Sequence, residues 1–289
     1  MKLSTFSIVA YDPAEEAWGV AVQSKFLAVG AVVPWARAGQ GAVATQSYAN
    51  TSYGPDGLAL MAAELSAAEA LARLVAADEG RERRQAGLVD AHGRTATYTG
   101  GACHAWAGGF TGPHYAVQGN ILVGCETVEA MAHGFESAGG ELADRLVAAL
   151  AAGQAAGGDR RGRQSAAVLV VRAAGGYGGY NDRYLDLRVD DDPRPIERLK
   201  GLVDLHHLFF QPPQPGEMEA VERALARELQ RILRRAGYYD GPVHGDYDAA
   251  TRRALRDLVG NENFEERFDE DAGLISRQVV AVLREKYGA

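Results

Sequence analysis

The chain has 289 residues, enough for one large domain or two domains of ordinary size. Hydrophobic residues make up 47% and charged residues 24%, close to the average of globular proteins, which excludes a disordered or fibrous chain. The 38 acidic residues outnumber the 30 basic ones and give a net charge of −8, so we expect no nucleic-acid partner and no membrane binding.

The cysteine content and the N-terminus favour a cytoplasmic protein. Only Cys103 and Cys125 are present, whereas small secreted proteins usually carry several disulfides. The N-terminus has no apolar stretch typical of a signal peptide. The longest apolar run, Phe26–Ala36, contains a proline and is well short of the ~20 residues that cross a bilayer.

Charge density divides the chain at a proline-rich segment. Residues 1–215 carry 41 charged side chains, and the much shorter stretch 216–289 carries 27. The change coincides with Gln211-Pro-Pro-Gln-Pro-Gly216, whose prolines favour an extended spacer. We predict a first domain over 1–210, a linker over 211–216 and a second domain over 217–289.

Hydrophobic periodicity predicts an alternation of strands and helix pairs in the first part. The predicted strands are Thr5–Tyr11, Trp18–Lys25, Gly30–Val33, Gly41–Gln46, Gly87–Asp90, Thr95–Thr99, Ala166–Val171 and Tyr184–Val189. Helices are expected from Pro55, from the Ser66/Glu69 capping box, from Thr127, over Leu142–Leu150 and over Ile196–Phe210. An α+β fold of two stacked sheets covered by helices, a four-layer αββα sandwich, fits this order.

The second part is predicted to be a small all-α module of three helices. These are Met218–Ala236, about Ala249–Val259 and Leu274–Tyr287. Gly237 follows the first of them and can take the left-handed conformation that closes a helix.

Six segments, in order along the chain, resemble the DUF1028 family over most of residues 3–210. They are Thr5-Phe-Ser-Ile-Val-Ala, Val22-Gln-Ser-Lys-Phe, Trp106-Ala-Gly, Gln118-Gly-Asn-Ile-Leu, Arg161-Gly-Arg-Gln-Ser-Ala and Asn181-Asp-Arg-Tyr-Leu-Asp-Leu-Arg-Val-Asp-Asp. The resemblance implies a bacterial or archaeal protein with an N-terminal-nucleophile (Ntn) hydrolase-like fold. The tail, with Gly237-Tyr-Tyr-Asp-Gly and Thr251-x-x-Ala-Leu, resembles the peptidoglycan-binding module often attached to this family.

The resemblance implies a catalytic threonine. In an Ntn hydrolase the free α-amine of the first residue, with a pKa near 7.7–8, takes the proton of that residue's own side chain. Thr5 is the matching candidate, but Met1–Ser4 precede it, and an acylated nitrogen is not basic. Thr5 is equally compatible with an ordinary β-branched strand residue.

A looser similarity to proteasome-type subunits implies the other catalytic positions. Lys25 or Arg37 would stabilise the alkoxide, Asn120 in a glycine turn would face the oxyanion, and Asp159 and Ser165 would orient the amine. The alternatives are solvated surface charges, a self-capping Asn turn and local caps. The predicted substrate-binding residues are Ser24, Gln46, Gln118, Gly119, Asn181 and Asp182.

Two pairs of adjacent residues have side chains that could act as a nucleophile and base or bind a metal, but neither pair has a suitable geometry. Cys103 and His104 would point to opposite faces of a strand, and His206 and His207 diverge by about 100° on a helix. No spacing typical of a metal site is present, so we expect no metal and no cofactor.

The leading hypothesis is an amidohydrolase that cleaves a small amide or peptide-like bond through an acyl intermediate on Thr5. The first alternative is a non-catalytic protein that binds a ligand or partner with the same fold, and the second is an assembly subunit, such as a homodimer. Peptidoglycan binding is doubtful, because a cytoplasmic chain meets no mature cell wall and Tyr238-Tyr239 at a helix end more often close a small core.

Overall fold

The computed structural model describes residues 5–214 and 216–288 and divides into two compact units, Met1–Val203 and Asp204–Ala289. The division falls within helix α5, Pro195–Phe210. Residues Met1–Ser4, which would have to be removed from Thr5, lie outside the described residues, as does Pro215 of the predicted linker. The predicted domain boundaries therefore stay a prediction.

The first unit contains a six-stranded antiparallel sheet in the order β10-β9-β2-β1-β8-β7. Its strands are β1 Thr5–Asp12, β2 Ala17–Ser24, β7 Gly108–Gly112, β8 Tyr115–Asn120, β9 Ser165–Arg172 and β10 Arg183–Val189. The turn between β1 and β2 forms because the Asp12 carboxylate accepts hydrogen bonds from the amides of Ala14 and Glu15. The central strands β1 and β2 are almost wholly buried.

A four-stranded antiparallel sheet in the order β3-β4-β5-β6 lies against the first sheet. Its strands are β3 Pro34–Arg37, β4 Gly41–Ser47, β5 Arg84–Asp90 and β6 Thr95–Thr99. Valines and alanines of both sheets form one core cluster between them, with Val9, Val20, Ala44 and Val89 among its members. The two sheets therefore pack face to face.

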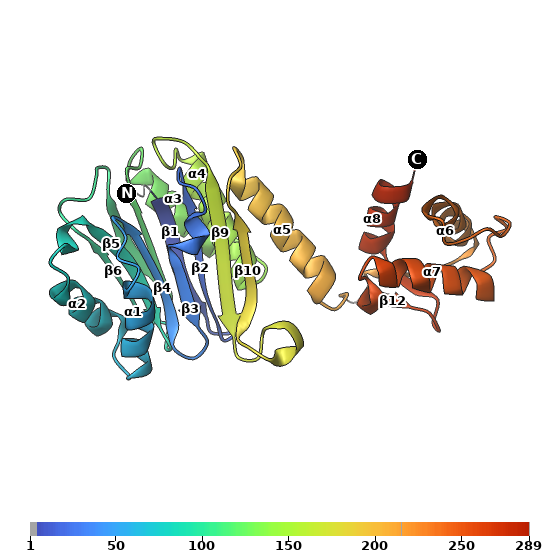
Figure 1. Ribbon diagram of the computed structural model, residues 1–289, viewed down its shortest axis with the longest axis horizontal. Helices are drawn as coiled ribbons and strands as arrows, with labels where there is room; N and C mark the ends of the chain where they lie inside the picture. The colour runs from blue at the N-terminus through green and yellow to red at the C-terminus, as the bar shows by residue number, and fades with distance from the viewer. Residues whose placement is uncertain (1–4, 215, 289) are drawn as a thin grey trace. The chain divides into compact units, whose positions relative to one another are not determined.

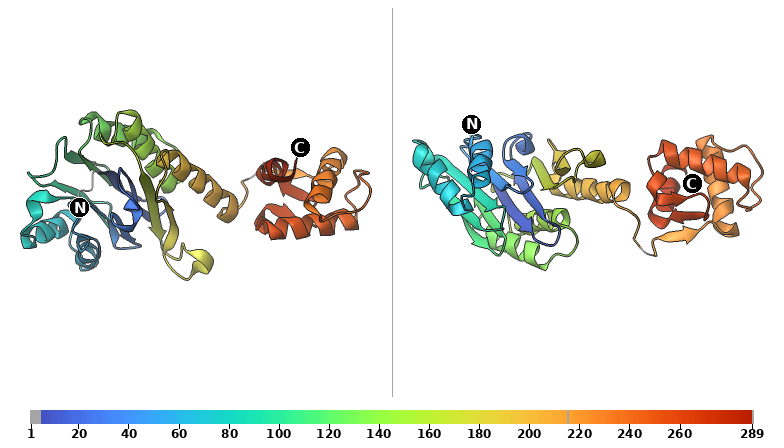
Figure 2. Two further views of the ribbon diagram at one scale, coloured as in Figure 1. Left: turned by 45° about the horizontal axis from the view of Figure 1, so that its top comes forward. Right: turned by 90° about the horizontal axis from the view of Figure 1, so that it is seen from below.

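Helices cover the outer face of each sheet (Figures 1 and 2). Helices α3 Glu126–Ser137 and α4 Leu142–Ala155 pack on the six-stranded sheet, and α1 Tyr53–Ala62 and α2 Ala67–Ala77 pack on the four-stranded one. The capping box of Ser66 and Glu69 starts α2 as predicted. The predicted mixture of helices and strands in one unit is confirmed.

Three local predictions for the first unit are wrong. Gly30–Val33 is not a strand: Val29–Ala31 form a 3-10 turn, and β3 begins only at Pro34. Helix α1 begins before Pro55 and ends before Leu65. Strands β7 and β8 were not predicted. Glycine is frequent in β7 and weakens its strand pattern, and the two strands are established by pairing, β8 with β1 and β7 with β8.

The second unit combines three helices with a short three-stranded sheet. The helices are α6 Arg223–Ala236, α7 Ala249–Asn261 and α8 Arg277–Tyr287, and the strands are β11 Met218–Ala220, β12 Phe268–Asp269 and β13 Leu274–Ser276 in the order β11-β13-β12. The predicted helices over Met218–Ala236 and Leu274–Tyr287 are too long at their N-terminal ends. Three-residue strands are too short for periodicity to separate them from the helices that follow.

Tyr239 closes the core of the second unit. Its side chain is buried, and its hydroxyl donates a hydrogen bond to the Pro242 carbonyl at 3.0 Å. Tyr238 packs against the same core. The Tyr239 ring is therefore a core residue of the second unit, which leaves little of its face for stacking on a sugar, whereas Tyr238 is half-buried.

Arg267 is the central polar side chain of the second unit. It is 3% exposed and donates hydrogen bonds to the carbonyls of His207, Leu208 and Gln211 at 2.8–2.9 Å. Nη1 also donates to the side chain of Gln278 at 3.1 Å. One guanidinium thus binds three carbonyls at the end of α5, including that of Leu208, to which Pro212 has no N–H to donate.

Replacing Arg267 with Lys is expected to lower the free energy of unfolding by about 2–4 kcal/mol. The reason is that one lysine ammonium cannot reach all of the carbonyls that the five N–H donors of the planar guanidinium satisfy. Urea unfolding of the full chain, followed by far-UV circular dichroism, measures the change. The exposed Arg277→Lys is the control. Equal stability of the two variants would contradict the proposed role of Arg267.

Candidate functional site

A row of polar side chains crosses the six-stranded sheet at one end. Thr5, the first residue of β1, pairs with Ser24 of β2 and with Asn120 of β8. Ser24 in turn pairs with Ser165 of β9. Directly paired residues point to the same side of a sheet, as do residues two or four positions along a strand. The apolar residues at these positions pack between the sheets: Val9, Val22, Ala116 and Ala167. The Thr5 hydroxyl therefore lies between the sheets, where it donates a hydrogen bond to Ser24 Oγ at 3.3 Å.

Amide side chains from both sheets meet this row. Gln46 of β4 donates through Nε2 to Gln85 Oε1 of β5 at 2.8 Å. Asn120 donates to the same oxygen at 2.9 Å, from the opposite sheet. Gln85 Nε2 donates to the Gly119 carbonyl at 2.7 Å. These hydrogen bonds join the two sheets at the end where β1 begins.

Ser7 and Gln118 extend the network one step along their strands. Ser7 Oγ donates to Gln46 Oε1 at 2.7 Å and accepts from Gln118 Nε2 at 2.7 Å. We call this set the inter-sheet polar cluster; each member is at most 1% exposed, and it comprises Thr5, Ser7, Ser24, Gln46, Gln85, Gln118 and Asn120. Its side chains are hydroxyls and carboxamides, so acid–base chemistry at the cluster needs a proton acceptor from elsewhere.

Two buried side chains fasten the segment that follows β2. The Asp159 carboxylate accepts a hydrogen bond from the amide of Lys25 at 2.9 Å. Ser165 Oγ donates to the Phe26 carbonyl at 2.5 Å and accepts from the Val29 amide at 3.1 Å. Asp159 and Ser165 therefore fix the main chain beside the polar row.

The two predicted cations do not enter the cluster. The Lys25 ammonium lies at the exposed surface, where it donates to a main-chain carbonyl at 3.4 Å. Arg37 is the last residue of β3 and pairs with Gly41. Gly41 is five residues from Gln46 along β4, about 17 Å at the rise of an extended strand. Arg37 thus lies at the other end of the sandwich from Thr5.

Asn181 and Asp182 lie at the same end as Arg37. The Asp182 carboxylate accepts from the Ala38 amide at 2.9 Å, and its carbonyl accepts from the Arg172 amide at 2.9 Å. Arg172 is the last residue of β9, whose first residue is Ser165. The predicted grouping of Asn181 and Asp182 with Thr5 is therefore not found in the structure.

The predicted turn at Gly119-Asn120 is wrong. Both residues belong to β8, where Gly119 pairs with Phe6 and Asn120 with Thr5. The Gly119 carbonyl already accepts a hydrogen bond from Gln85. Gly119 is extended here because β8 is hydrogen-bonded to strands on both sides, and not because glycine itself prefers the strand conformation. Any oxyanion contact at this position would come from the Asn120 side-chain amide.

Cys103 and His104 lie in the loop before β7 and not in a strand, contrary to the expectation from the sequence. Cys103 Sγ donates to the Arg84 carbonyl at 3.3 Å. Burial raises the pKa of the Cys103 thiol, so the thiol stays protonated and is a poor nucleophile.

Sequence reasoning missed Ser7 and Gln85. Both occupy positions in apolar strands that alternation alone assigns to either face, and a polar residue there is normally read as pointing to solvent. Ser7 and Gln85 can be recognised as inward-facing only from the burial of both faces of their strands. That burial is known only once the position of the second sheet is known.

The fold and the cluster define a mixed α/β protein with a hydroxyl-and-amide site buried between two sheets and a separate, largely helical C-terminal unit. The chain belongs to the family described as "Family of unknown function (DUF1028)", which matches residues 5–199. A second description, "Putative peptidoglycan binding domain", matches residues 208–283. The predicted resemblance is confirmed for both parts of the chain.

One solved structure supports the same assignment. The crystal structure of protein SPO2555 from Silicibacter pomeroyi, of the DUF1028 family, is similar with a TM-score of 0.65 and 29% sequence identity, over 71% of this chain and 89% of that chain. Among curated proteins no match is found. In the part of the chain that the structure describes, no helix is long and apolar enough to span a bilayer.

Gly87 of β5 provides a test of the cluster's packing. A Cβ at Gly87 would overlap the carboxamide of Gln118. Gly87→Ala is therefore expected to lower the free energy of unfolding by about 1–3 kcal/mol, measured by urea unfolding. The control is Gly201→Ala in α5, where a Cβ meets nothing within 4 Å and stability should rise by up to about 1 kcal/mol. A Gly87→Ala variant as stable as the parent would contradict this packing.

Proposed function

We propose that the first unit is an Ntn hydrolase-like amidohydrolase with Thr5 as its nucleophile. The observation that carries the proposal is the position of Thr5: it begins β1, its hydroxyl lies between the two sheets, and Ser24 and Asn120 flank it on the paired strands. The arrangement of helices, sheet, sheet and helices supports the Ntn-like assignment of the fold.

The proposed reaction needs a free amine at Thr5. Once the residues before Thr5 are removed, the α-amine takes the hydroxyl proton while Oγ1 bonds to the carbonyl carbon of the substrate amide. The C–N bond then breaks as the ammonium returns the proton to the leaving nitrogen. Water hydrolyses the resulting ester, which releases the acid and restores the Thr5 hydroxyl.

The neighbouring residues have matching proposed roles. The Asn120 carboxamide would donate to the oxyanion, since amide donors aimed at developing charge supply such stabilisation without a metal. Asp159 and Ser165 would act as positioning residues that hold the segment after Ser24. Lys25 would contribute its backbone amide to that segment rather than its charge.

The cluster also indicates the class of substrate. Gln46 and Gln118 face Ser7, and all of these groups donate or accept hydrogen bonds without a net charge. A neutral amide or peptide-like bond matches such groups better than a charged group, whose desolvation they could not offset. Ser24, Gln46, Gln118 and Gly119 would line the substrate side of the site.

The first test is the intact mass of the full chain expressed with its native N-terminus. We expect a species lacking residues 1–4, and a covalent adduct at Thr5 after treatment with a β-lactone. Thr5→Ala should abolish both the adduct and any hydrolysis in a panel of amides, while exposed Thr51→Ala should change neither. Retention of all 289 residues together with no adduct would refute the proposal.

A second candidate is a non-catalytic ligand-binding protein. It is favoured by one observation: the Thr5 side chain is 0% exposed, and the amides around it hydrogen-bond one another. A closed network of this kind serves as a specific polar core. In that case the chain keeps residues 1–4, and Thr5→Ala lowers thermal stability but leaves ligand binding unchanged.

The proposals for localisation and assembly rest on the sequence. We propose a cytoplasmic protein that acts on a small amide-type substrate and forms a homodimer. For the second unit we propose a protein-interaction or lid role in place of cell-wall binding, supported by the buried ring of Tyr239. Light scattering at micromolar concentration tests the dimer, and a monomer would exclude it.

A further inference from the structure

An open groove of about 660 Å³ lies between β3, β10 and helix α1 at one edge of the sandwich. Strand β3 is the edge strand of the four-stranded sheet, and β10 is the edge strand of the six-stranded one. The volume is within the ~300–1,000 Å³ typical of small-molecule sites. Arg37 lines the groove at the end of the sandwich away from Thr5, so the proposed amidohydrolase reaction does not use it.

Three charged side chains of β10 point to the side of the sheet where the groove lies. They are Arg183, Asp186 and Arg188, which pair directly with Val171, Leu169 and Ala167 of β9. These partners pack between the two sheets, and directly paired residues share a face. A bulge after Arg183 shifts the alternation by one residue, which brings Arg183 to the same face as Asp186 and Arg188. The four-stranded sheet ends at β3 and leaves this row open to solvent.

Asp186 holds the two arginines of β10 together. Its carboxylate accepts from Arg188 Nε at 2.8 Å and from Arg188 Nη2 at 3.0 Å. Arg183 Nη1 lies 3.1 Å from the same carboxylate. The side chains of Arg183 and Arg188 remain 60% and 38% exposed, so a ligand can reach the N–H groups that Asp186 leaves unused.

Arg37 brings a third cation to the groove from β3. The amide of the next residue, Ala38, donates to the Asp182 carboxylate at 2.9 Å, which ties the end of β3 to the residue before Arg183. Arg37 is exposed and has no ion pair among residues 5–214 and 216–288. Three arginines against the single carboxylate of Asp186 make this groove positive, in a chain whose net charge is −8.

The groove also has a fixed apolar wall. Trp35 and Leu58 line it. A Cβ on Gly54 of α1 would lie 2.2–2.6 Å from ring atoms of Trp35, so the indole packs directly on the main chain of the helix. The indole N–H donates to the Val32 carbonyl at 3.1 Å. The complement of this wall and the arginines is an anionic group carried on an apolar body.

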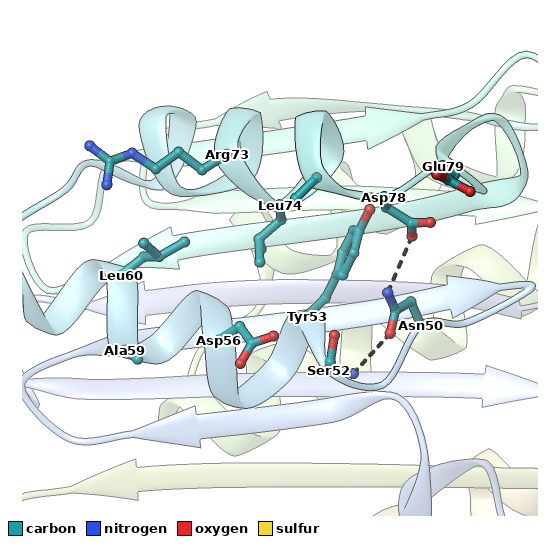
Figure 3. A pocket seen from close by; sticks show the side chains of 11 residues that line it. Asn50, Ser52, Tyr53, Asp56, Ala59, Leu60, Arg73, Leu74, Asp78 and Glu79 are labelled. Atoms are coloured by element: carbon teal, nitrogen blue, oxygen red, sulfur yellow. Dashed lines mark hydrogen bonds between the residues drawn. The ribbon is translucent and has the colours of Figure 1, made fainter.

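The pocket of about 710 Å³ between α1 and α2, on the outer face of the four-stranded sheet, does not bring like charges together (Figure 3). The Tyr53 hydroxyl in it is hydrogen-bonded to Asp78. The exposed Asp56, Glu79 and Arg73 lie apart in Figure 3 and carry charges of both signs. The groove beside β3 is therefore the better candidate for a charged ligand.

We propose that the groove between β3, β10 and α1 binds a small organic carboxylate. The carboxylate accepts hydrogen bonds from Arg37 and from the remaining N–H groups of Arg183 and Arg188, since guanidinium groups pair well with carboxylates. The apolar body of the ligand packs on Trp35 and Leu58. This site is separate from Thr5 and does not depend on the proposed hydrolysis.

Isothermal titration of the full chain with benzoate tests the inference, with benzyl alcohol, benzylamine and inorganic phosphate as comparisons. We expect saturable benzoate binding that added salt weakens, because part of the attraction is between charges. The alcohol and the amine should not bind, and phosphate should bind more weakly because it has no apolar body. Absence of saturable benzoate binding, equal binding of benzyl alcohol, or tighter binding of phosphate would overturn the proposal.

Four variants locate the ligand. Arg37→Gln and Arg188→Gln should each weaken benzoate binding by about fivefold, whereas Arg81→Gln, an exposed arginine near the opposite end of the four-stranded sheet, should leave it unchanged. Thr5→Ala should bind benzoate as tightly as the parent, which separates this site from the proposed active site.

Thermal unfolding shows whether a loss of binding reflects loss of the fold. Because Arg37 has no ion pair among the described residues, Arg37→Gln should keep the thermal midpoint of the parent. Unchanged benzoate binding in both Arg37→Gln and Arg188→Gln, or loss of binding in Thr5→Ala, would refute the placement of the ligand in the groove.

Discussion

The hydrogen bonds that Gln85 makes across the sandwich are the interaction on which the rest of the first unit depends. Its carboxamide accepts from Gln46 in its own sheet and from Asn120 in the other, and it donates to the Gly119 carbonyl. In a fully buried layer each of these groups must be satisfied by another part of the protein. The pairing fixes how the two sheets face each other and encloses the start of β1.

The position of Thr5 follows from that constraint. Gln85 holds Asn120, and the register of β1 with β8 and β2 places Thr5 opposite Asn120 and beside Ser24. A threonine at a strand end is unremarkable in itself, but here it is surrounded by neutral donors and acceptors and by no side-chain base within the cluster. Such a site becomes reactive only if the base comes with the nucleophile, as a terminal amine does.

The layers of the fold separate two kinds of surface. Between the sheets the polar groups of the inter-sheet polar cluster are neutral and enclosed, whereas those that line the pocket between α1 and α2 include charged groups open to solvent. The four-stranded sheet between them is the physical barrier.

The sequence by itself determined the order of most helices and strands, the family, and Thr5 at the start of the first strand, because these depend on local periodicity and on short motifs. It misplaced Arg37, Asn181 and Asp182 and missed Gln85, because a residue's neighbours across two sheets are set by strand register over long separations. Only the tertiary structure decided which polar side chains face inward, since alternation is the same for either face.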